Sequence, residues 1–189
     1  MQGSRLILAS ASPQRKKLMK EAGYEFDVCV SPLDEPNHMA RQMHPASHSE
    51  ALAWFKCAAV AKDFSYATVL AADTIVAAAG EIIGKPADAD DARHILRILC
   101  RHRHAVVTSL AIISPSCERI IISVATWVKM RLLDEREIEN YIESGEWRGK
   151  AGAYGIQGAA DAFVEKIDGS YTNVIGLPME AVKKFIPLD

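Results

Sequence analysis

One carboxylate stands in an otherwise uncharged stretch of the chain. Asp73 is the only charged residue between Ala67 and Ala79, in the apolar run ATVLAADTIVAAA. An ionised carboxylate in a buried strand is costly unless it is paired, hydrogen-bonded or bound to a metal. Asp73 is therefore a candidate metal ligand or general base, with a turn-capping aspartate at the strand end as the alternative. A regular strand places Thr74 on the opposite face.

A short segment after the first apolar run combines hydroxyls with cations. Ser10 and Ser12 stand where a strand is expected to end, and Pro13 opens a helix whose first turn carries Arg15 and Lys16. Cations oppose the dipole at a helix N-terminus, whereas a bound anion would accept hydrogen bonds from its N–H groups. The segment therefore indicates a phosphate site. The alternative is a serine-capped helix with solvated basic residues.

Two lysines stand in unusual surroundings. Lys56 shares a helix face with the apolar residues Leu52, Ala59 and Val60, so it either extends to solvent or reaches a buried anion. Lys85 lies between a glycine and a proline at the end of an expected hairpin, which biases its backbone toward extended geometry. Both lysines are candidates for phosphate binding, and an exposed turn lysine is the alternative for Lys85.

The segment from Gly149 to Gly158 carries four glycines in ten residues, in the sequence GKAGAYGIQG. Glycine permits unusual backbone angles and a close approach of the backbone to a ligand. Lys150 and Gln157 lie in this segment, and the Gln157 amide is able to hydrogen-bond to the edge of a base. Lys150 is a further candidate for substrate binding. A flexible loop is the alternative.

Other catalytic patterns are missing from the sequence. It contains no G-x-S-x-G elbow, no P-loop and no G-x-G-x-x-G fingerprint. Its cysteines form no C-x-x-C pair and no zinc spacing, which is typical of reduced thiols in a cytoplasmic protein: they are Cys29, Cys57, Cys100 and Cys117. Several separated cations and one or two acids remain. This set suits a polyphosphate substrate with a divalent metal.

Strands and helices must bring these separated residues together. Apolar periodicity predicts strands over residues 5–10, 25–30, 67–79, 105–114 and 119–130, a hairpin return through 82–83, and one strand in the tail. Helices are expected after five start signals: Ser12, a capping-box spacing over 47–50, Asp88, Asp134 and Pro178. Strands that alternate with helices and are interrupted by hairpins predict one α/β or α+β layered domain, residues 1–189, around a mixed sheet.

Composition limits the partners. The 189 residues include 22 Lys and Arg against 24 Asp and Glu, a net charge of −2, and 49% are hydrophobic. These values exclude a disordered chain and argue against a nucleic-acid polymer as partner. No apolar run is long enough for a membrane span or a signal-peptide core, so we expect a cytoplasmic protein without membrane contact. A small metal-chelated polyphosphate remains compatible if the cations converge on one cleft.

Together these segments resemble the Maf-like nucleoside triphosphate pyrophosphatase family over essentially the whole chain. The resemblance depends on five ordered motifs: LILASASPQRKKLM, Lys56-Cys57-Ala58, AADTIV with GEIIGKPADADDA, YIESGEWRGKAGAYGIQG, and IDGSYTNVIGLP. Each motif alone is weak, but five in order at matching spacings are highly specific. The resemblance implies an α/β fold similar to inosine triphosphatase, in which a mixed, twisted central sheet has helices on both faces and a substrate cleft across it.

The resemblance also implies an activity, hydrolysis of a nucleoside triphosphate to the monophosphate and pyrophosphate with a divalent cation, Mg or Mn. Asp73 matches the family's proposed general base and a metal ligand. Arg15, Lys56 and Lys85 match its phosphate-binding cations, and Glu35 matches an acidic position near the metal. A homodimer is an expectation from the resemblance alone.

Within the family, Asp73-Thr74 and the YGIQG segment resemble the branch that acts on dTTP and UTP, with Thr74 and Gln157 in contact with the base. One position departs from the pattern. The family usually shows two arginines after Ser-Pro, and here the first is Gln14, which carries no charge. This change bears on base selectivity, whereas Arg15 keeps the charge for catalysis.

Two further functions stay open at this stage. One is a nucleotide-binding regulator of cell division with little hydrolysis, which would bind nucleotide without metal-dependent production of monophosphate. The other is a pyrophosphatase for modified or deaminated purine triphosphates, which a panel of triphosphates separates from the dTTP and UTP activity.

Overall fold

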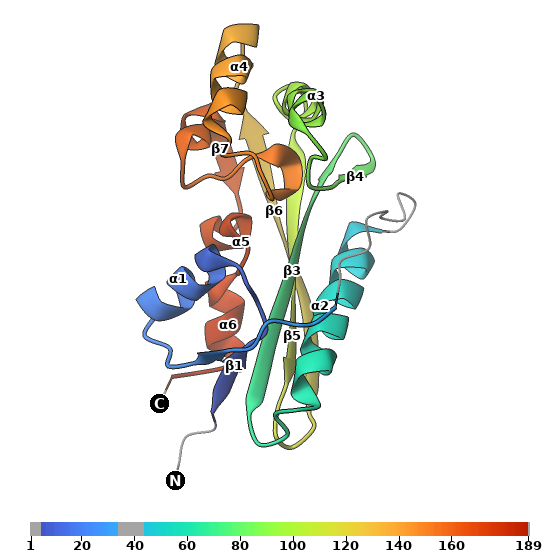
Figure 1. Ribbon diagram of the computed structural model, residues 1–189, viewed down its shortest axis with the longest axis vertical. Coiled ribbons are helices and arrows are strands. Elements are labelled where there is room, and N and C mark those ends of the chain that lie inside the picture. Colours follow the sequence, from blue (N-terminus) through green and yellow to red (C-terminus); the bar gives the residue numbers. More distant parts are fainter. Residues whose placement is uncertain (1–4, 34–43, 189) are drawn as a thin grey trace.

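The computed structural model describes residues 5–33 and 44–188 and is built around one mixed sheet (Figure 1). The strands are β1 (Leu6–Leu8), β2 (Asp27–Val28), β3 (Thr68–Ala78), β4 (Glu81–Ile83), β5 (His104–Ile113), β6 (Arg119–Met130) and β7 (Val164–Asp168). The helices are α1 (Pro13–Glu21), α2 (Pro45–Ala61), α3 (Ala89–Leu99), α4 (Glu135–Ser144), α5 (Tyr171–Ile175) and α6 (Met179–Phe185), with 3₁₀ turns η1 (Ala151–Ala153) and η2 (Ala159–Phe163). The expected α/β class with a mixed sheet is confirmed.

The sheet is parallel at one side and antiparallel at the other. Its strand order is β2-β1-β3-β5-β6-β7, and β4 pairs with β3 off this path. Only the pairs of β1 with β2 and β3 are parallel; the remaining pairs are antiparallel. The long central pair, β3 with β5, aligns residues 69–77 with 105–113. Strands β3, β5 and β6 cross most of the molecule's length in Figure 1.

Period-two alternation on β3 sends successive side chains to different helical layers. Val69 and Ala71 belong to an apolar cluster with α2, whereas Leu70 and Ala72 belong to another with α1 and α6. Figure 1 shows the same arrangement, with α2 on one side of β3 and α1, α5 and α6 on the other. The helices on both faces that the resemblance implied are therefore present.

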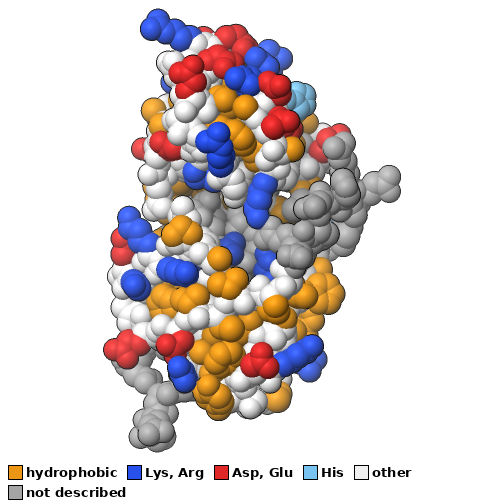
Figure 2. Space-filling model, in the orientation of Figure 1, with side chains coloured by type: hydrophobic (Ala, Val, Ile, Leu, Met, Phe, Trp, Pro, Cys, Tyr) orange, Lys and Arg blue, Asp and Glu red, His pale blue; other side chains and the backbone are white. Residues whose placement is uncertain are grey.

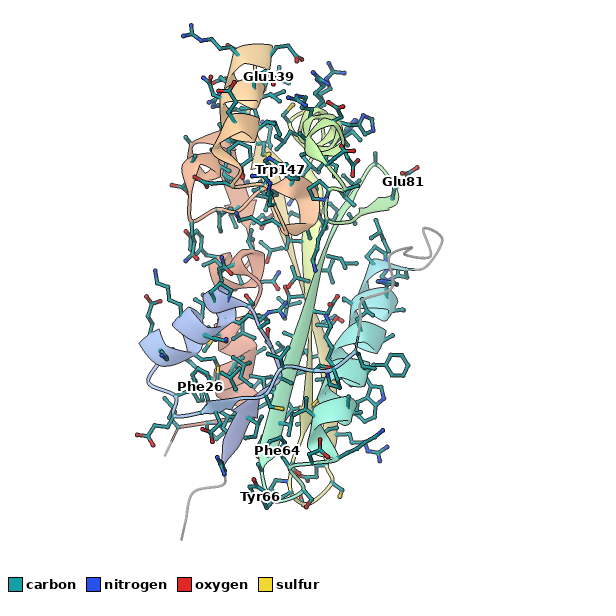
Figure 3. The ribbon with its side chains drawn as sticks, in the orientation of Figure 1. Phe26, Phe64, Tyr66, Glu81, Glu139 and Trp147 are labelled. Carbon is teal, nitrogen blue, oxygen red and sulfur yellow. The ribbon has the colours of Figure 1, made fainter. Side chains whose placement is uncertain are left out.

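The third cluster joins α3, α4 and the glycine-rich segment at the other end of β3. Trp147 lies beneath α4 in Figure 3, buried in this cluster, and donates its indole N–H to the Ile142 carbonyl at 3.1 Å. Arg93 of α3 and Glu139 of α4 form a bidentate ion pair with bonds of 2.7 and 2.8 Å. This packing fixes the segment that follows α4 over the sheet.

One of the predicted helix starts differs from the structure. Ser12 caps α1 and Asp134 caps α4, where the sequence predicts helix starts; Asp134 also forms a capping box with Glu137. The capping box expected at residues 47–50 is wrong, because α2 begins at Pro45 and its expected cap residue, Ser47, lies inside the helix. Glu50, the acid of that spacing, instead accepts a hydrogen bond from the Ser123 hydroxyl on β6 at 2.6 Å, a tertiary contact that local spacing does not reveal. Helix α5 was not expected.

Candidate active site

An unpaired edge of β3 forms the floor of the site. On that side of β3, β1 pairs with residues 68–70 and β4 pairs with residues 76–78. Between them, no described strand pairs with residues 71–75 on this side, whereas β5 pairs with them on the other side. A cleft of about 760 Å³ opens there. Figure 2 shows the hollow in the middle of this face, with Lys and Arg side chains around it.

The cleft collects almost every residue that the sequence singled out. Chain segments that leave β1 and β4, the face of α2 and the glycine-rich segment all contribute to its wall. The predicted site residues that line it are Ser10, Ser12, Gln14, Arg15, Lys56, Asp73, Thr74, Lys85, Lys150 and Gln157. The expected convergence of the separated cations is therefore confirmed. Glu35 lies outside the described residues.

Asp73 and Lys56 form a buried ion pair. The Lys56 Nζ lies 2.6 Å from Asp73 Oδ1, and the two side chains are 13% and 7% exposed. The alternatives of a turn-capping Asp73 and a solvent-directed Lys56 are therefore wrong: Asp73 lies within β3, and Lys56 turns inward from α2. The second carboxylate oxygen of Asp73 is buried and has no hydrogen-bond partner among the described residues.

That unpartnered oxygen is the feature that fits a metal. A buried carboxylate oxygen without a donor is a poor arrangement unless a cation or a proton satisfies it. Mg²⁺ is usually bound by one or two carboxylates together with substrate phosphates, so Asp73 suffices as one protein ligand. Over residues 5–33 and 44–188, no group of three or more His, Cys, Asp or Glu side chains is placed to hold a metal.

Arg15 is fixed on the opposite face of β3 by neutral oxygens. Its Nε donates to the Gly176 carbonyl at 2.8 Å, and its Nη1 donates to the Ala72 carbonyl at 2.7 Å and the Ser10 hydroxyl at 3.2 Å. Its Nη2 donates to the Thr74 hydroxyl at 3.1 Å. These four bonds hold the guanidinium in place at the wall of the cleft.

The start of α1 places Gln14 beside Arg15. The Ser12 hydroxyl accepts from the Arg15 backbone N–H at 3.4 Å and donates to Gln14 Oε1 at 3.2 Å. The Ser12 N–H in turn bonds to the Ser10 hydroxyl at 3.2 Å. The serines therefore shape the turn between β1 and α1, in addition to lining the cleft.

The glycine-rich segment is closely packed. Gly152 has a φ of +72°, and a Cβ there would lie 2.9 Å from Val76 Cγ2. A Cβ on Gly155 would lie 2.8 Å from Lys150 Cε. The Lys150 ammonium donates to the Glu146 carbonyl, so this lysine braces the segment as well as lining the cleft. At Gly152, the positive φ and the close approach to a branched side chain explain the need for glycine.

The segment is also tied to the hairpin that carries Lys85. The Gly152 N–H donates to the Gly84 carbonyl at 3.0 Å. Lys85 is exposed and lies at the rim of the cleft, whereas Gln157 is exposed on the glycine-rich segment. One hydrogen bond thus links the two segments that supply a cation and a side-chain amide to the same cleft.

Sequence reasoning missed three contributors. Thr108 on β5 bonds to Thr74, and the Gly176 carbonyl after α5 accepts from Arg15. Asn173 in α5 acts one step further away, because its carbonyl accepts from Thr108. Asn173 and Gly176 belong to the motif IDGSYTNVIGLP, which the resemblance included without assigning a role. Thr108 gives no signal in the sequence, since one threonine in a buried strand is ordinary; the pairing of β5 with β3 places it opposite Thr74.

A mixed α/β sheet with clustered cations and one buried acid at an open strand edge defines a protein that binds an anionic ligand in its cleft. The chain belongs to the Maf-like protein family, whose model matches residues 5–187. No helix that the structure describes has the length and apolar character needed to cross a membrane.

Individual relatives carry a more specific name. A protein of Alkaliphilus metalliredigens named dTTP/UTP pyrophosphatase is 46% identical over 177 residues, covering 93% of this chain and 91% of its own. A protein of the same name from Dictyoglomus thermophilum is 44% identical, covering 92% of this chain and 90% of its own. A solved dITP/XTP pyrophosphatase from Mycobacterium abscessus aligns with 67% of this chain and 74% of its own, at 14% identity and a TM-score of 0.42, values too low to bear on the fold.

Proposed function

We propose that this protein hydrolyses nucleoside triphosphates of the dTTP and UTP type to the monophosphate and pyrophosphate, with a divalent metal ion. The observation that carries the proposal is the buried Asp73–Lys56 pair, with one unpartnered carboxylate oxygen, in a cleft that also collects Arg15 and Lys85. The names of the relatives support the base preference. The cytoplasmic location and the homodimer stay predictions.

The side chains of the cleft divide the chemistry between them. Arg15, Lys56 and Lys85 bind the phosphates and stabilise the negative charge that develops on the leaving pyrophosphate. Asp73 orients and deprotonates the water that attacks the α-phosphorus, and the Lys56 ammonium holds the carboxylate in place through its Oδ1 at 2.6 Å. Asp73 would hold Mg²⁺ or Mn²⁺, with Glu35 as the proposed second ligand; the bound metal would polarise the phosphate oxygens.

Base recognition is assigned to the far side of the same strand. Thr74 faces α1 and α5, away from the Asp73–Lys56 pair, because adjacent residues of a strand point to opposite faces. Thr74 and Gln157 would contact the base, and Gln14 lies close to Arg15 at the same wall. The open edge of β3 lets one ligand reach both faces of the strand.

Asp73→Asn tests the proposal most directly. The substitution keeps the shape of the side chain but removes the base and the anionic ligand, so pyrophosphate release from dTTP and UTP with Mg²⁺ should fall about 10²–10⁴-fold. Asp27→Asn is the matched control, since Asp27 is exposed, pairs with Arg5 and does not line the cleft; its turnover should equal wild type. Near-normal turnover by Asp73→Asn refutes the assignment.

A panel of triphosphates settles the substrate class. The proposal expects dTTP and UTP to be preferred over CTP, ATP and the deaminated purine triphosphates. Preference for a deaminated purine triphosphate would contradict the base assignment but keep the reaction. Saturable nucleotide binding without metal-dependent monophosphate production would replace the enzyme with a regulator.

A further inference from the structure

A chain of hydroxyls runs from the cleft into the protein on the Thr74 face of the sheet. Thr74 and Thr108 are directly paired across β3 and β5, and their hydroxyl oxygens lie 3.0 Å apart. Thr74 lines the cleft, whereas Thr108 is fully buried. The Thr108 hydroxyl donates to the backbone carbonyl of Asn173 at 3.1 Å. The cleft hydroxyl is thus connected to a buried carbonyl by one intermediate group.

The groups at the two ends of this series of hydrogen bonds determine which hydroxyl donates and which accepts. A hydroxyl has one proton and two lone pairs, a guanidinium only donates, and a carbonyl only accepts. Because Thr108 gives its proton to the Asn173 carbonyl, it accepts the proton of Thr74. Thr74 in turn accepts from Arg15 Nη2 at 3.1 Å. One lone pair of Thr74 remains, so Thr74 presents an acceptor to a ligand.

Asn173 holds the far end of the chain in place. Its side-chain amide donates to the Val106 carbonyl and to the Thr126 hydroxyl, each at 3.0 Å, and its own N–H donates to the Ser170 hydroxyl at 3.1 Å. The residue is fully buried. Its carbonyl therefore has a fixed position. Through Thr108, this buried carbonyl orients the O–H bond of Thr74, so the orientation does not depend on groups in the cleft.

A fixed acceptor distinguishes bases by the protonation of one ring nitrogen. Uracil and thymine carry a proton on N3 and donate there, whereas N3 of cytosine is an acceptor. An acceptor facing an acceptor leaves both groups desolvated and unpaired, which is unfavourable. Gln157 does not provide this selection by itself, because an exposed amide is able to turn either its oxygen or its nitrogen toward the base.

We propose that Thr108 is a positioning residue for substrate selection: by holding the proton of Thr74, it makes Thr74 a hydrogen-bond acceptor and favours bases with an imide N–H, uracil and thymine, over cytosine. This inference rests on the proposed function, since it takes the base to lie against Thr74. It adds a residue that touches no substrate and acts only through the hydroxyl of another.

Thr108→Val tests the inference because valine has nearly the same shape but no hydroxyl. The nearest acceptor left for the Thr74 proton is then the Gly176 carbonyl at 3.5 Å, a weak partner, so the proton is free to turn toward the cleft. The ratio of kcat/KM for UTP over CTP should fall about tenfold, and Thr108→Ser should restore it. Ser109→Ala is the matched control, since Ser109 is a buried hydroxyl of β5 on the opposite face.

Calorimetric binding of α,β-methylene UTP and CTP, which are not cleaved between the α- and β-phosphates, gives the same ratio without turnover. If the wild-type protein hydrolyses no triphosphate, the proposed function is refuted. Tighter binding of the UTP analogue than of the CTP analogue, lost in Thr108→Val, would still support the inference. An unchanged UTP-to-CTP ratio in Thr108→Val, or an equal loss for both nucleotides, overturns the inference. Thr108→Ala carries the same expectation if Thr108→Val does not fold.

Discussion

The Asp73–Lys56 pair makes a stability prediction that is independent of any substrate. Lys56→Met keeps the length of the side chain and removes its charge, which leaves the Asp73 carboxylate buried without this counter-ion. Asp73→Asn does the reverse and leaves the Lys56 ammonium buried. Each substitution is therefore expected to destabilise the fold, and the double substitution is expected to cost less than the sum of the two.

The size of the expected loss of stability follows from the burial of the pair. The two charges are 2.6 Å apart, and their side chains are only 13% and 7% exposed. Removing one partner of such a buried pair costs about 3–5 kcal/mol. For a chain of this size about 1 kcal/mol corresponds to roughly 2–4 °C, so Tm should fall by about 10 °C in each single variant. The coupling between the two sites should be about 2 kcal/mol.

Urea unfolding of the wild type, both single variants and the double variant measures these quantities. Lys17→Met is the control, since Lys17 and Glu21 lie 3.7 Å apart on the exposed face of α1 with side chains 62% and 59% exposed. An exposed pair of this kind contributes about 0–1 kcal/mol. If Lys56→Met costs no more than the control, or if the two single costs add, the pair is solvated and the argument for a desolvated Asp73 fails.

Three further predictions concern selectivity, pH and packing. Gln14→Arg restores a charged, rigid donor beside Arg15 and should sharpen the preference for dTTP and UTP over other triphosphates in a kcat/KM panel; an unchanged profile rules out Gln14 as the selectivity position. Burial lowers the pKa of His104 from 6.5 to about 4, so its contribution to stability is complete above pH 6.5 and is lost as the pH falls toward 4. Urea unfolding should therefore show about 2 kcal/mol less stability at about pH 5 than at about pH 7.5. The variant His104→Gln should show a smaller difference between these two pH values. Gly152→Ala combines a φ of +72° with a Cβ 2.9 Å from Val76, so it should lower stability by about 1–3 kcal/mol, and an unchanged Tm would contradict the packing argument.

Local sequence was sufficient for most of the elements. Ser12 before Pro13, and Asp134 with Glu137, give side-chain caps that depend only on residues within one helical turn, and both helices begin where expected. The wrong prediction for the start of α2 also depended on local spacing alone. Residues 47–50 have capping-box spacing, but Pro45 already starts the helix, and the Glu50 carboxylate accepts a hydrogen bond from Ser123, 73 residues away.

By itself, the sequence determined which residues are chemically costly. A single charge in an apolar strand, Asp73, and a lysine on an apolar helix face, Lys56, each require a partner, because desolvating an isolated charge is unfavourable in any fold. The tertiary structure decided that these two residues pair with each other. It also decided that β1 and β4 leave residues 71–75 of β3 open, which creates the cleft.

Hydrogen-bond direction was the property least visible in the sequence. Thr74, Thr108 and Asn173 are ordinary polar residues in three separate segments, and nothing in their spacing relates them. Strand register sets Thr108 opposite Thr74, and the packing of α5 sets the Asn173 carbonyl behind it. Residue types are local and can be read from the chain, whereas the orientation of a hydroxyl depends on neighbours that only the folded chain brings within about 3 Å.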